Sequence, residues 1–280
     1  MKKEVFDNFF KPYSENVDQV DLNSAFWRLS DKIILEIIKK EILINSNKES
    51  VIMDAGGGTG RWIIKMSKET DSKFVLYDRS EDMLLKAKTN ISVDGIENRT
   101  EIINGDLTDI KEITDSSIDY IVSIYSPISF IYENEKAFKE LYRVLKPNGK
   151  ILIMGHGLYN ALYSKINNYN ATAEEIKKLN EEHIVKWSPH VPDLIAYSKE
   201  SMEDNLNKSG FTIDKTYGIP VFVQPGSEDF NSNNEGVSRI SKYLENEKNF
   251  NQVFEIEMAS NSLPTVANRG MNIFTLATKK

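Results

Sequence analysis

The stretch that decides the fold is VIMDAGGGTGRW, residues 51–62, in which an apolar run ends at Asp54 and three consecutive glycines follow Ala55. Glycine weakens regular structure, so a run of it indicates a sharp backbone turn or the close approach of another group. A strand, then glycine at alternate positions, then a helix is typical of a loop that holds a nucleotide, because free N–H groups at the helix start face the ligand. A plain strand-to-helix turn is the competing interpretation, and the neighbouring segments decide between the two.

The segments that follow alternate between strand and helix patterns. Apolar runs of strand length occur at residues 73–78, 100–105, 118–126 and 150–155. Helical patterns cover residues 80–91 and 134–145, and Ser80 stands in the N-cap position of the first. Strands separated by helices of this length indicate βαβ units, and therefore an α/β fold with a Rossmann-like, mostly parallel sheet covered on both faces.

The rest of the chain lies outside this core pattern. Four regions are expected: an N-terminal helical segment or lid (1–47), the α/β core (48–157), an inserted cap (158–199), and the C-terminal part of the core (200–280) with a second insertion (220–269). In the first region, Ser30 is expected to cap a helix over residues 31–44. The aromatic-rich stretch before it suits either a lid over the ligand or a helix that covers the sheet.

Acidic residues at the ends of the next two strands support the nucleotide interpretation. Asp78 ends the second strand, 24 residues after Asp54, and its carboxylate can accept both hydroxyls of a ribose. Asp106 follows the third strand and could accept an adenine amino group while Leu107 packs on the ring. Asp54 itself could fix the glycine loop. A helix-flanking surface acid is the alternative for Asp78, and a loop residue the alternative for Asp106, but the order and spacing of these features favour the ligand roles.

A dinucleotide-binding loop is the nearest rival. Its G-x-G-x-x-G pattern requires a third glycine five residues after the first. Counted from Gly56 that position is Arg61, and counted from one residue earlier the first position is Ala55. Neither register fits, so the sequence does not predict NAD as the cofactor.

The ordered motifs VIMDAGGGTG, VLYDRS, NGDLTD, YIVSIYSPISFI and LYRVLKPNGKILI resemble those of class I S-adenosylmethionine-dependent methyltransferases. The resemblance is strong over residues 48–155 and implies a seven-stranded sheet whose last strand, 271–279, is antiparallel. It further implies that Tyr125 faces the methyl group and that S-adenosylhomocysteine is the product. The residues implied to contact S-adenosylmethionine are Asp54, Ala55, Gly56, Gly57, Gly58, Gly60, Asp78, Arg79, Gly105, Asp106, Leu107, Tyr125 and Ser126.

Composition excludes several classes of function. The formal net charge is −7 and no long basic run occurs, which argues against a nucleic-acid partner. The absence of cysteine excludes thiolate sites, and three histidines are too few for a His-rich metal centre, so no metal is expected. Apolar runs are far shorter than the roughly 20 residues that a membrane span needs, so we expect a cytoplasmic protein without membrane contact. Oligomeric state is left open.

Candidates for catalysis are few. His156 directly follows the fifth strand, at the edge where open α/β sheets bind ligands, and is the first choice as general base. Tyr125 and His190 are the further candidates, and a structural role is the alternative for His156. Arg28 and Arg61 could bind the cofactor carboxylate or an acidic substrate, with a surface ion pair as the alternative for each.

The sequence defines the methyl acceptor less well than the methyl donor. The place of the Asn/Asp-Pro-Pro-aromatic box of amino-methylating enzymes reads YSPISF, residues 125–130, which lacks the acid or amide and the second proline. We therefore expect transfer to oxygen or nitrogen of a small molecule or short peptide. The C-terminal half resembles methyltransferases of natural-product or peptide gene clusters, which implies a peptide C-terminal carboxylate as one such acceptor. An RNA methyltransferase and a non-catalytic S-adenosylmethionine-binding protein are the alternatives.

Overall fold

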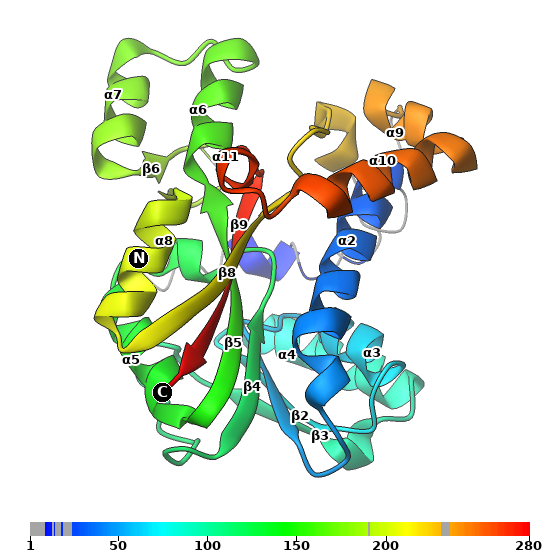
Figure 1. The fold of residues 1–280 in the computed structure, drawn as a ribbon, viewed down its shortest axis with the longest axis vertical. Coiled ribbons are helices and arrows are strands. Elements are labelled where there is room, and N and C mark those ends of the chain that lie inside the picture. The colour runs from blue at the N-terminus through cyan, green and yellow to red at the C-terminus, as the bar shows by residue number, and fades with distance from the viewer. Residues whose placement is uncertain (1–8, 13, 15–17, 19–23, 190, 231–235) are drawn as a thin grey trace.

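A twisted sheet runs through the centre of the molecule, and helices cover both of its faces (Figure 1). The computed structural model describes residues 9–12, 14, 18, 24–189, 191–230 and 236–280. The strands are β1 (Val51–Ala55), β2 (Lys73–Asp78), β3 (Thr100–Asn104), β4 (Ile118–Ser123), β5 (Leu145–Gly157), β6 (Ile184–Val185), β7 (Leu194–Tyr197), β8 (Phe211–Ile219) and β9 (Asn272–Lys279).

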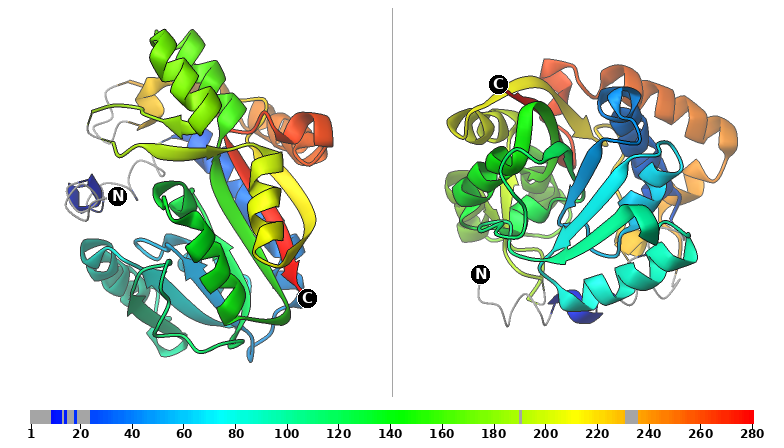
Figure 2. Two further views of the ribbon diagram at one scale, coloured as in Figure 1. Left: turned by 90° about the vertical axis from the view of Figure 1, so that its left-hand side faces the viewer. Right: turned by 90° about the horizontal axis from the view of Figure 1, so that it is seen from below.

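The strand order confirms the expected fold class. Strands β3, β2, β1, β4 and β5 lie side by side in that order and all pair in parallel. The last strand, β9, pairs antiparallel with both β5 and β8. The left view of Figure 2 shows β9, in red, between the green β5 and the yellow β8. The sheet is therefore Rossmann-like and mostly parallel, with one antiparallel strand in its interior.

The helices that connect these strands pack on two faces. The α-helices are α2 (Ala25–Glu41), α3 (Arg61–Ser67), α4 (Glu81–Val93), α5 (Asn134–Val144), α6 (Leu158–Asn167), α7 (Ala173–Glu182), α8 (Lys199–Lys208), α9 (Arg239–Leu244), α10 (Glu247–Ser260) and α11 (Pro264–Ala267). The 3-10 helices are η1 (Leu43–Asn45), η2 (Glu97–Arg99), η3 (Pro127–Phe130) and η4 (Ser227–Phe230). Buried side chains of α2, α3 and α4 form the core on one face, and those of α5 and α8 form the core on the other.

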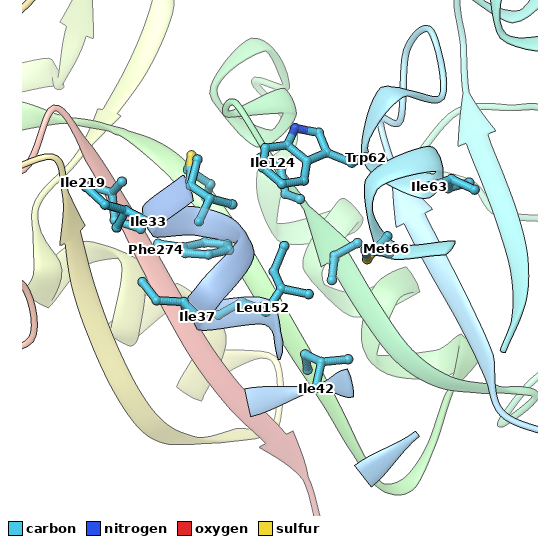
Figure 3. Close-up of a cluster of buried hydrophobic side chains, with 14 of the residues drawn as sticks. Ile33, Ile37, Ile42, Trp62, Ile63, Met66, Ile124, Leu152, Ile219 and Phe274 are labelled. Carbon is cyan, nitrogen blue, oxygen red and sulfur yellow. The ribbon is translucent and has the colours of Figure 1, made fainter. Parts of the chain in front are cut away.

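Helix α2 is the most deeply buried part of the N-terminal region. Figure 3 shows Ile33 and Ile37 of α2 against Leu152, Phe274 and Ile219 of the sheet, and all five are at most 1% exposed. Burying a side chain of this size stabilises the fold by about 1.5–3 kcal/mol. Residues 25–41 therefore form a packing helix that covers the sheet.

The predicted start of this helix was wrong. The cap is Ser24 rather than Ser30, and the Ser24 hydroxyl accepts the N–H of Trp27. Ser24 is held in place by a hydrogen bond to Asp229, far away in the sequence, which local patterns do not reveal. Ser30 lies inside the helix and is fully buried. By contrast, the predicted cap Ser80 accepts the N–H of Met83 at the start of α4.

Two further elements extend the sheet at the carboxyl end of β5. Strand β7 pairs in parallel with His156 and Gly157, and β6 pairs antiparallel with β7. Helices α6 and α7 stand above this end of the sheet (Figure 1). Helices α6 and α7 and strands β6 and β7 thus form a small layer with its own core around Leu179 and Ala196. Within the described ranges, every helix is too short or too polar to span a bilayer.

Candidate functional site

The glycine loop lies at the carboxyl end of β1, and its glycines serve different purposes. Gly56 has φ +77°, and a Cβ there would come within 2.4 Å of the Pro127 side chain in η3. Gly58 also has a positive φ, +54°, but a Cβ there would meet only Met83 Sδ at 3.9 Å. Gly56 is therefore required by the protein's own packing, whereas the space beside Gly58 is open enough for a ligand to approach the backbone.

Asp78 is held beside this loop by two backbone donors. Its Oδ2 accepts the N–H of Gly58 at 2.9 Å, and its Oδ1 accepts the N–H of Ser80 at 2.8 Å. Each carboxylate oxygen has further lone pairs, so the group can accept two more hydrogen bonds from one side. A pair of vicinal hydroxyls, such as those of a ribose, fits this arrangement.

Asp54 is a buried acid next to the loop. It is 1% exposed, and its Oδ2 has no hydrogen-bond partner within the described residues. Burial, and then the negative charge of Asp78, raises the pKa of Asp54 to about 7. A carboxylate oxygen left without a donor fits a ligand that brings one, such as an ammonium group.

The residues around the end of β3 are arranged less favourably for a ligand. Asp106 is exposed, and its Oδ1 accepts both the N–H and the hydroxyl of Thr108 at 2.9 and 2.8 Å. Arg79 Nη1 lies 3.9 Å from Asp106 Oδ2. Leu107 is buried in the core, and a Cβ on Gly105 would collide with the hydroxyl of Tyr77. The adenine role of this group stays a prediction.

The backbone after β4 adopts a left-handed conformation that residues other than glycine rarely adopt. Tyr125 and Ser126 have φ values of +58° and +66°, and Ser126 Oγ donates to Asn272 Oδ1 at 3.1 Å. Strained backbone of this kind clusters at functional sites. The hydroxyl of Ser123, at the end of β4, donates to the carbonyl of Ala55 at 2.7 Å and so ties this segment to the glycine loop.

Asp31 is a residue of this site that the sequence analysis missed. Tyr125 donates its hydroxyl hydrogen to Asp31 Oδ1 at 2.5 Å, and Arg61 Nη1 lies 2.6 Å from Asp31 Oδ2. Asp31 is 7% exposed and occupies the apolar face of α2, between Trp27 and Ile34. An acid on the buried face of a helix was the signal that could have found it.

His156 lies within β5, which runs to Gly157, and not just after the strand as the sequence suggested. Its backbone N–H donates to Ser129 Oγ at 2.9 Å, and its ring packs edge-on against Trp187. Burial lowers the pKa of His156 to about 4, and Nε2 has no partner within the part of the chain that the structure describes. The imidazole is therefore neutral at physiological pH. His190, the third catalytic candidate, lies outside the described residues.

The two candidate arginines differ in their surroundings. Arg28 forms an ion pair with Glu245 at 2.8 Å, and both side chains are largely exposed. Arg61, 18% exposed, pairs with the buried Asp31 and lies over the rings of Trp62 and Tyr125, 5.5 and 5.3 Å from their centroids. The surface-pair alternative therefore describes Arg28, whereas Arg61 belongs to the interior of the site.

Part of the N-terminal segment contacts the loop. Asp18 accepts hydrogen bonds from the Thr59 hydroxyl at 2.8 Å and from Asn90 Nδ2 at 3.1 Å. The rings of Phe9 and Phe10 lie 6.2 and 5.2 Å from that of Phe130, between centroids. These contacts place the described residues of this segment beside the glycine loop and η3, and the lid stays a prediction.

One cavity of the molecule, about 240 Å³, lies elsewhere. It is lined by residues of α5, α8, the β6–β7 pair and the end of α7, among them Asn134, His183, Tyr197 and Asn205. None of its lining residues belongs to the predicted site. His183 ends α7 in the left-handed conformation, and its carbonyl accepts the N–H of Ala196.

Comparisons with known proteins agree with this geometry. A family profile described as a methyltransferase domain matches residues 46–210. The tRNA 5-carboxymethoxyuridine methyltransferase of Escherichia coli (strain K12) is 24% identical over 165 residues, which cover 56% of this chain and 59% of the relative. The ubiquinone/menaquinone biosynthesis C-methyltransferase UbiE of Rickettsia prowazekii (strain Madrid E) is 27% identical over 211 residues, or 69% of this chain and 79% of the relative. The chain thus spans less than two thirds of the first relative's length.

Solved structures share the fold. The complex of the Haloferax volcanii Trm112 methyltransferase activator and a putative methyltransferase matches with a TM-score of 0.61 at 12% identity, over 96% of each chain. A putative S-adenosyl-L-methionine-dependent methyltransferase from Methanococcus maripaludis matches with a TM-score of 0.51 at 25% identity, over 73% of this chain and 87% of that one.

Proposed function

The chain belongs to the methyltransferase-domain family of class I S-adenosylmethionine-dependent enzymes, and from that premise we propose that it transfers a methyl group to oxygen or nitrogen of a small molecule or short peptide. The observation that best supports S-adenosylmethionine as the methyl donor is the Asp78 carboxylate at the end of β2. It is held there by the N–H groups of Gly58 and Ser80. Its two oxygens suit the ribose hydroxyls of the cofactor.

Other residues of the loop would complete the donor site. Asp54 offers a buried oxygen without a partner in the described ranges to the amino group of the methionine moiety. The open face of Gly58 allows the backbone to approach the ligand. Asp106 and Leu107 remain the candidates for the adenine, next to Gly105 and Arg79. Tyr125 and Ser126 would border the methyl group, with Gly56, Gly57, Gly60 and Ala55 shaping the loop.

S-adenosylmethionine supplies a methyl group on a sulfonium, which is already activated for displacement. The protein's contribution is then mainly to hold the acceptor in line with that group, an effect worth about 7–11 kcal/mol at best. His156 is neutral above about pH 4 and can therefore accept a proton from an acceptor, although its low pKa makes it a weak base. If His156→Ala leaves turnover intact, the role of His156 as general base is refuted.

RNA is the second candidate acceptor, because the Escherichia coli relative is by name a tRNA methyltransferase. The net charge of −7 argues against it, since binding a polyanion requires clustered cations. The assay that decides is transfer of tritium-labelled methyl groups from S-adenosylmethionine into cell extract, separated into tRNA and low-mass fractions. Label in the low-mass fraction is expected, and label confined to tRNA would contradict the small-molecule proposal.

The donor site can be tested without knowing the acceptor. Calorimetry should show that Asp78→Ala weakens binding of S-adenosylmethionine and S-adenosylhomocysteine by about 10²–10³-fold, because two hydrogen bonds to a charged group are lost. Glu81→Ala removes an exposed acid three residues away and serves as the matched control. Unchanged affinity in Asp78→Ala would refute the ribose role. A wild-type chain that binds neither compound would refute the cofactor proposal.

A further inference from the structure

The last strand reaches the candidate site through its first residue. Strand β9 runs antiparallel to β5, and Asn272, where β9 begins, is paired with His156 near the carboxyl end of β5. Asn272 therefore lies at the edge where the parallel strands end and where open α/β sheets bind their ligands. It is 4% exposed, so its polar atoms need partners within the protein.

Both sides of the Asn272 amide are used. Its Oδ1 accepts the hydroxyl hydrogen of Ser126 at 3.1 Å, and its Nδ2 donates to the carbonyl of Ile219, at the end of β8, at 3.3 Å. Because the carbonyl of Ile219 requires a donor, the carbonyl oxygen of the amide is left to face Ser126. Asn272 thus offers Ser126 an acceptor whose direction is determined by the sheet.

Ser126 needs such support because of its backbone. Its φ is +66° and that of Tyr125 before it is +58°, so two successive residues with side chains adopt the left-handed conformation. This conformation brings Cβ too close to the following carbonyl oxygen, and it persists only where surrounding contacts enforce it. The carbonyl of Ser126 accepts the N–H of Ser129 within its own turn. Among the described residues, Asn272 is the one hydrogen-bond partner of the Ser126 side chain.

We propose that Asn272 is a positioning residue of the donor site. It holds Ser126 in the left-handed conformation and so keeps the segment after β4 in the shape that the methionine end of the cofactor requires. This inference rests on the proposed function, in which Tyr125 and Ser126 border the methyl group. It adds a residue of the last strand to the site, outside the residues 46–210 that the family profile matches.

Asn272→Ala removes the acceptor, and two ligands report where the effect is felt. In the proposed site, S-adenosylhomocysteine extends to the segment after β4 through its amino-acid end, which adenosine lacks. Calorimetry should show that the variant binds S-adenosylhomocysteine about tenfold more weakly, because the left-handed conformation is no longer enforced. Saturation-transfer NMR should show that its affinity for adenosine stays within about twofold. A merely structural role would weaken both ligands alike and leave the ratio of their affinities unchanged.

Thr275→Val is the matched control. Thr275 lies in the same strand, is fully buried and shares a hydrogen bond with Thr216 at 3.2 Å. The substitution removes a buried side-chain hydrogen bond of β9 other than that of Asn272. Both affinities of this variant should stay within about twofold of those of the wild type.

Ser126→Gly tests whether Asn272 acts through the backbone of Ser126. Glycine adopts the left-handed conformation without help, so adding Asn272→Ala to Ser126→Gly should weaken S-adenosylhomocysteine by less than about a further twofold. If Asn272→Ala does not fold, Ser126→Ala replaces it. That variant deletes the hydroxyl but keeps a side chain in the unfavourable conformation, and the same loss of about tenfold is expected.

Three results with Asn272→Ala would overturn the inference: an unchanged affinity for S-adenosylhomocysteine, an equal loss of affinity for adenosine, or the full loss when it is added to Ser126→Gly. An unchanged affinity in Ser126→Ala would overturn it as well. A wild-type chain that fails to bind S-adenosylhomocysteine would remove the proposed function itself. That failure is distinguishable, because it precedes any measurement on the variants.

Discussion

The part of the molecule around the glycine loop and the part formed by the segments around α2, α9 and α10 are held together in different ways. In the first, the groups that matter are fixed by their own loops: Asp78 is held by Gly58 and Ser80. In the second, buried acids join segments that are far apart in the sequence. Asp229 accepts hydrogen bonds from Ser24, Ser241 and the N–H of Gly226, and so connects α2, α9 and the loop before η4.

Glu257 is the other acid of this kind. It is fully buried in α10, and its carboxylate accepts the backbone N–H groups of Val221, Phe222 and Val223 at 2.9, 2.8 and 3.3 Å. These donors belong to the loop between β8 and η4, outside any helix or strand. The difference shows that local turns shape the glycine loop and its neighbours, whereas a few long-range polar anchors hold α2, α9, α10 and the loop after β8 in place.

The largest effect is expected when an anchor is removed. Glu257→Ala leaves three N–H groups, two of them in buried residues, without an acceptor and should lower the free energy of unfolding by about 3–5 kcal/mol. Urea denaturation measures it, with Glu255→Ala, an exposed position on the same helix, as the control. A loss below about 1 kcal/mol would show that the loop does not depend on this acid.

Asp54, the buried acid beside the glycine loop, should have the opposite effect from Glu257: its removal should raise the free energy of unfolding at high pH. The pKa of Asp54 is raised to about 7 from an ordinary value of 3.8, so the folded state holds a proton that the unfolded state releases. Its contribution to stability is therefore present below about pH 4 and is lost as the pH rises through 7.

Asp54→Asn should remove this pH dependence. At pH 8, without ligand, the variant should be more stable than the wild type by roughly 2–3 kcal/mol, while it binds S-adenosylhomocysteine more weakly. Urea titrations at pH 5 and pH 8 give the comparison. A variant that is less stable than the wild type at pH 8 would mean that Asp54 is a structural anchor like Glu257.

A smaller effect is expected at the open glycine. Gly58→Ala forces an alanine into a left-handed conformation, at a cost of about 1–2 kcal/mol, with nothing closer than Met83 Sδ to collide with. The free energy of binding S-adenosylhomocysteine should be weakened by more than this, because the alanine methyl group would occupy the space through which the ligand approaches the backbone. If stability and affinity fall equally, Gly58 serves the fold alone.

The smallest effect belongs to the surface of the second half. Arg28→Ala removes an exposed ion pair with Glu245 and should change the free energy of unfolding by less than about 0.5 kcal/mol. Thermal unfolding at low and high salt measures it. A larger loss would place Arg28 among the anchors and weaken the distinction between them and the surface.

The same contrast explains what could be predicted from the sequence. The alternation of strands and helices, the glycine loop and the cap Ser80 follow from patterns within a few residues, and the structure agrees with them. The antiparallel last strand was implied by the family resemblance, and the structure confirms it. Ser24 caps α2 with the help of Asp229, so the earlier start of that helix was not visible locally. Asp31 could have been noticed as an acid on an apolar helix face, but its partners Tyr125 and Arg61 come from other elements.

The position of β9 has a consequence for how the chain is made. It is the last strand in chain order, yet both of its neighbours, β5 and β8, emerge from the ribosome before it. Until residues 272–279 follow, β5 exposes a row of unpaired N–H and C=O groups, and α2 lacks Phe274 to pack against. The growing chain therefore exposes an unpaired strand edge to other proteins while residues 158–271 are being made. A premature stop before β9 would yield material prone to aggregation, not a shortened enzyme.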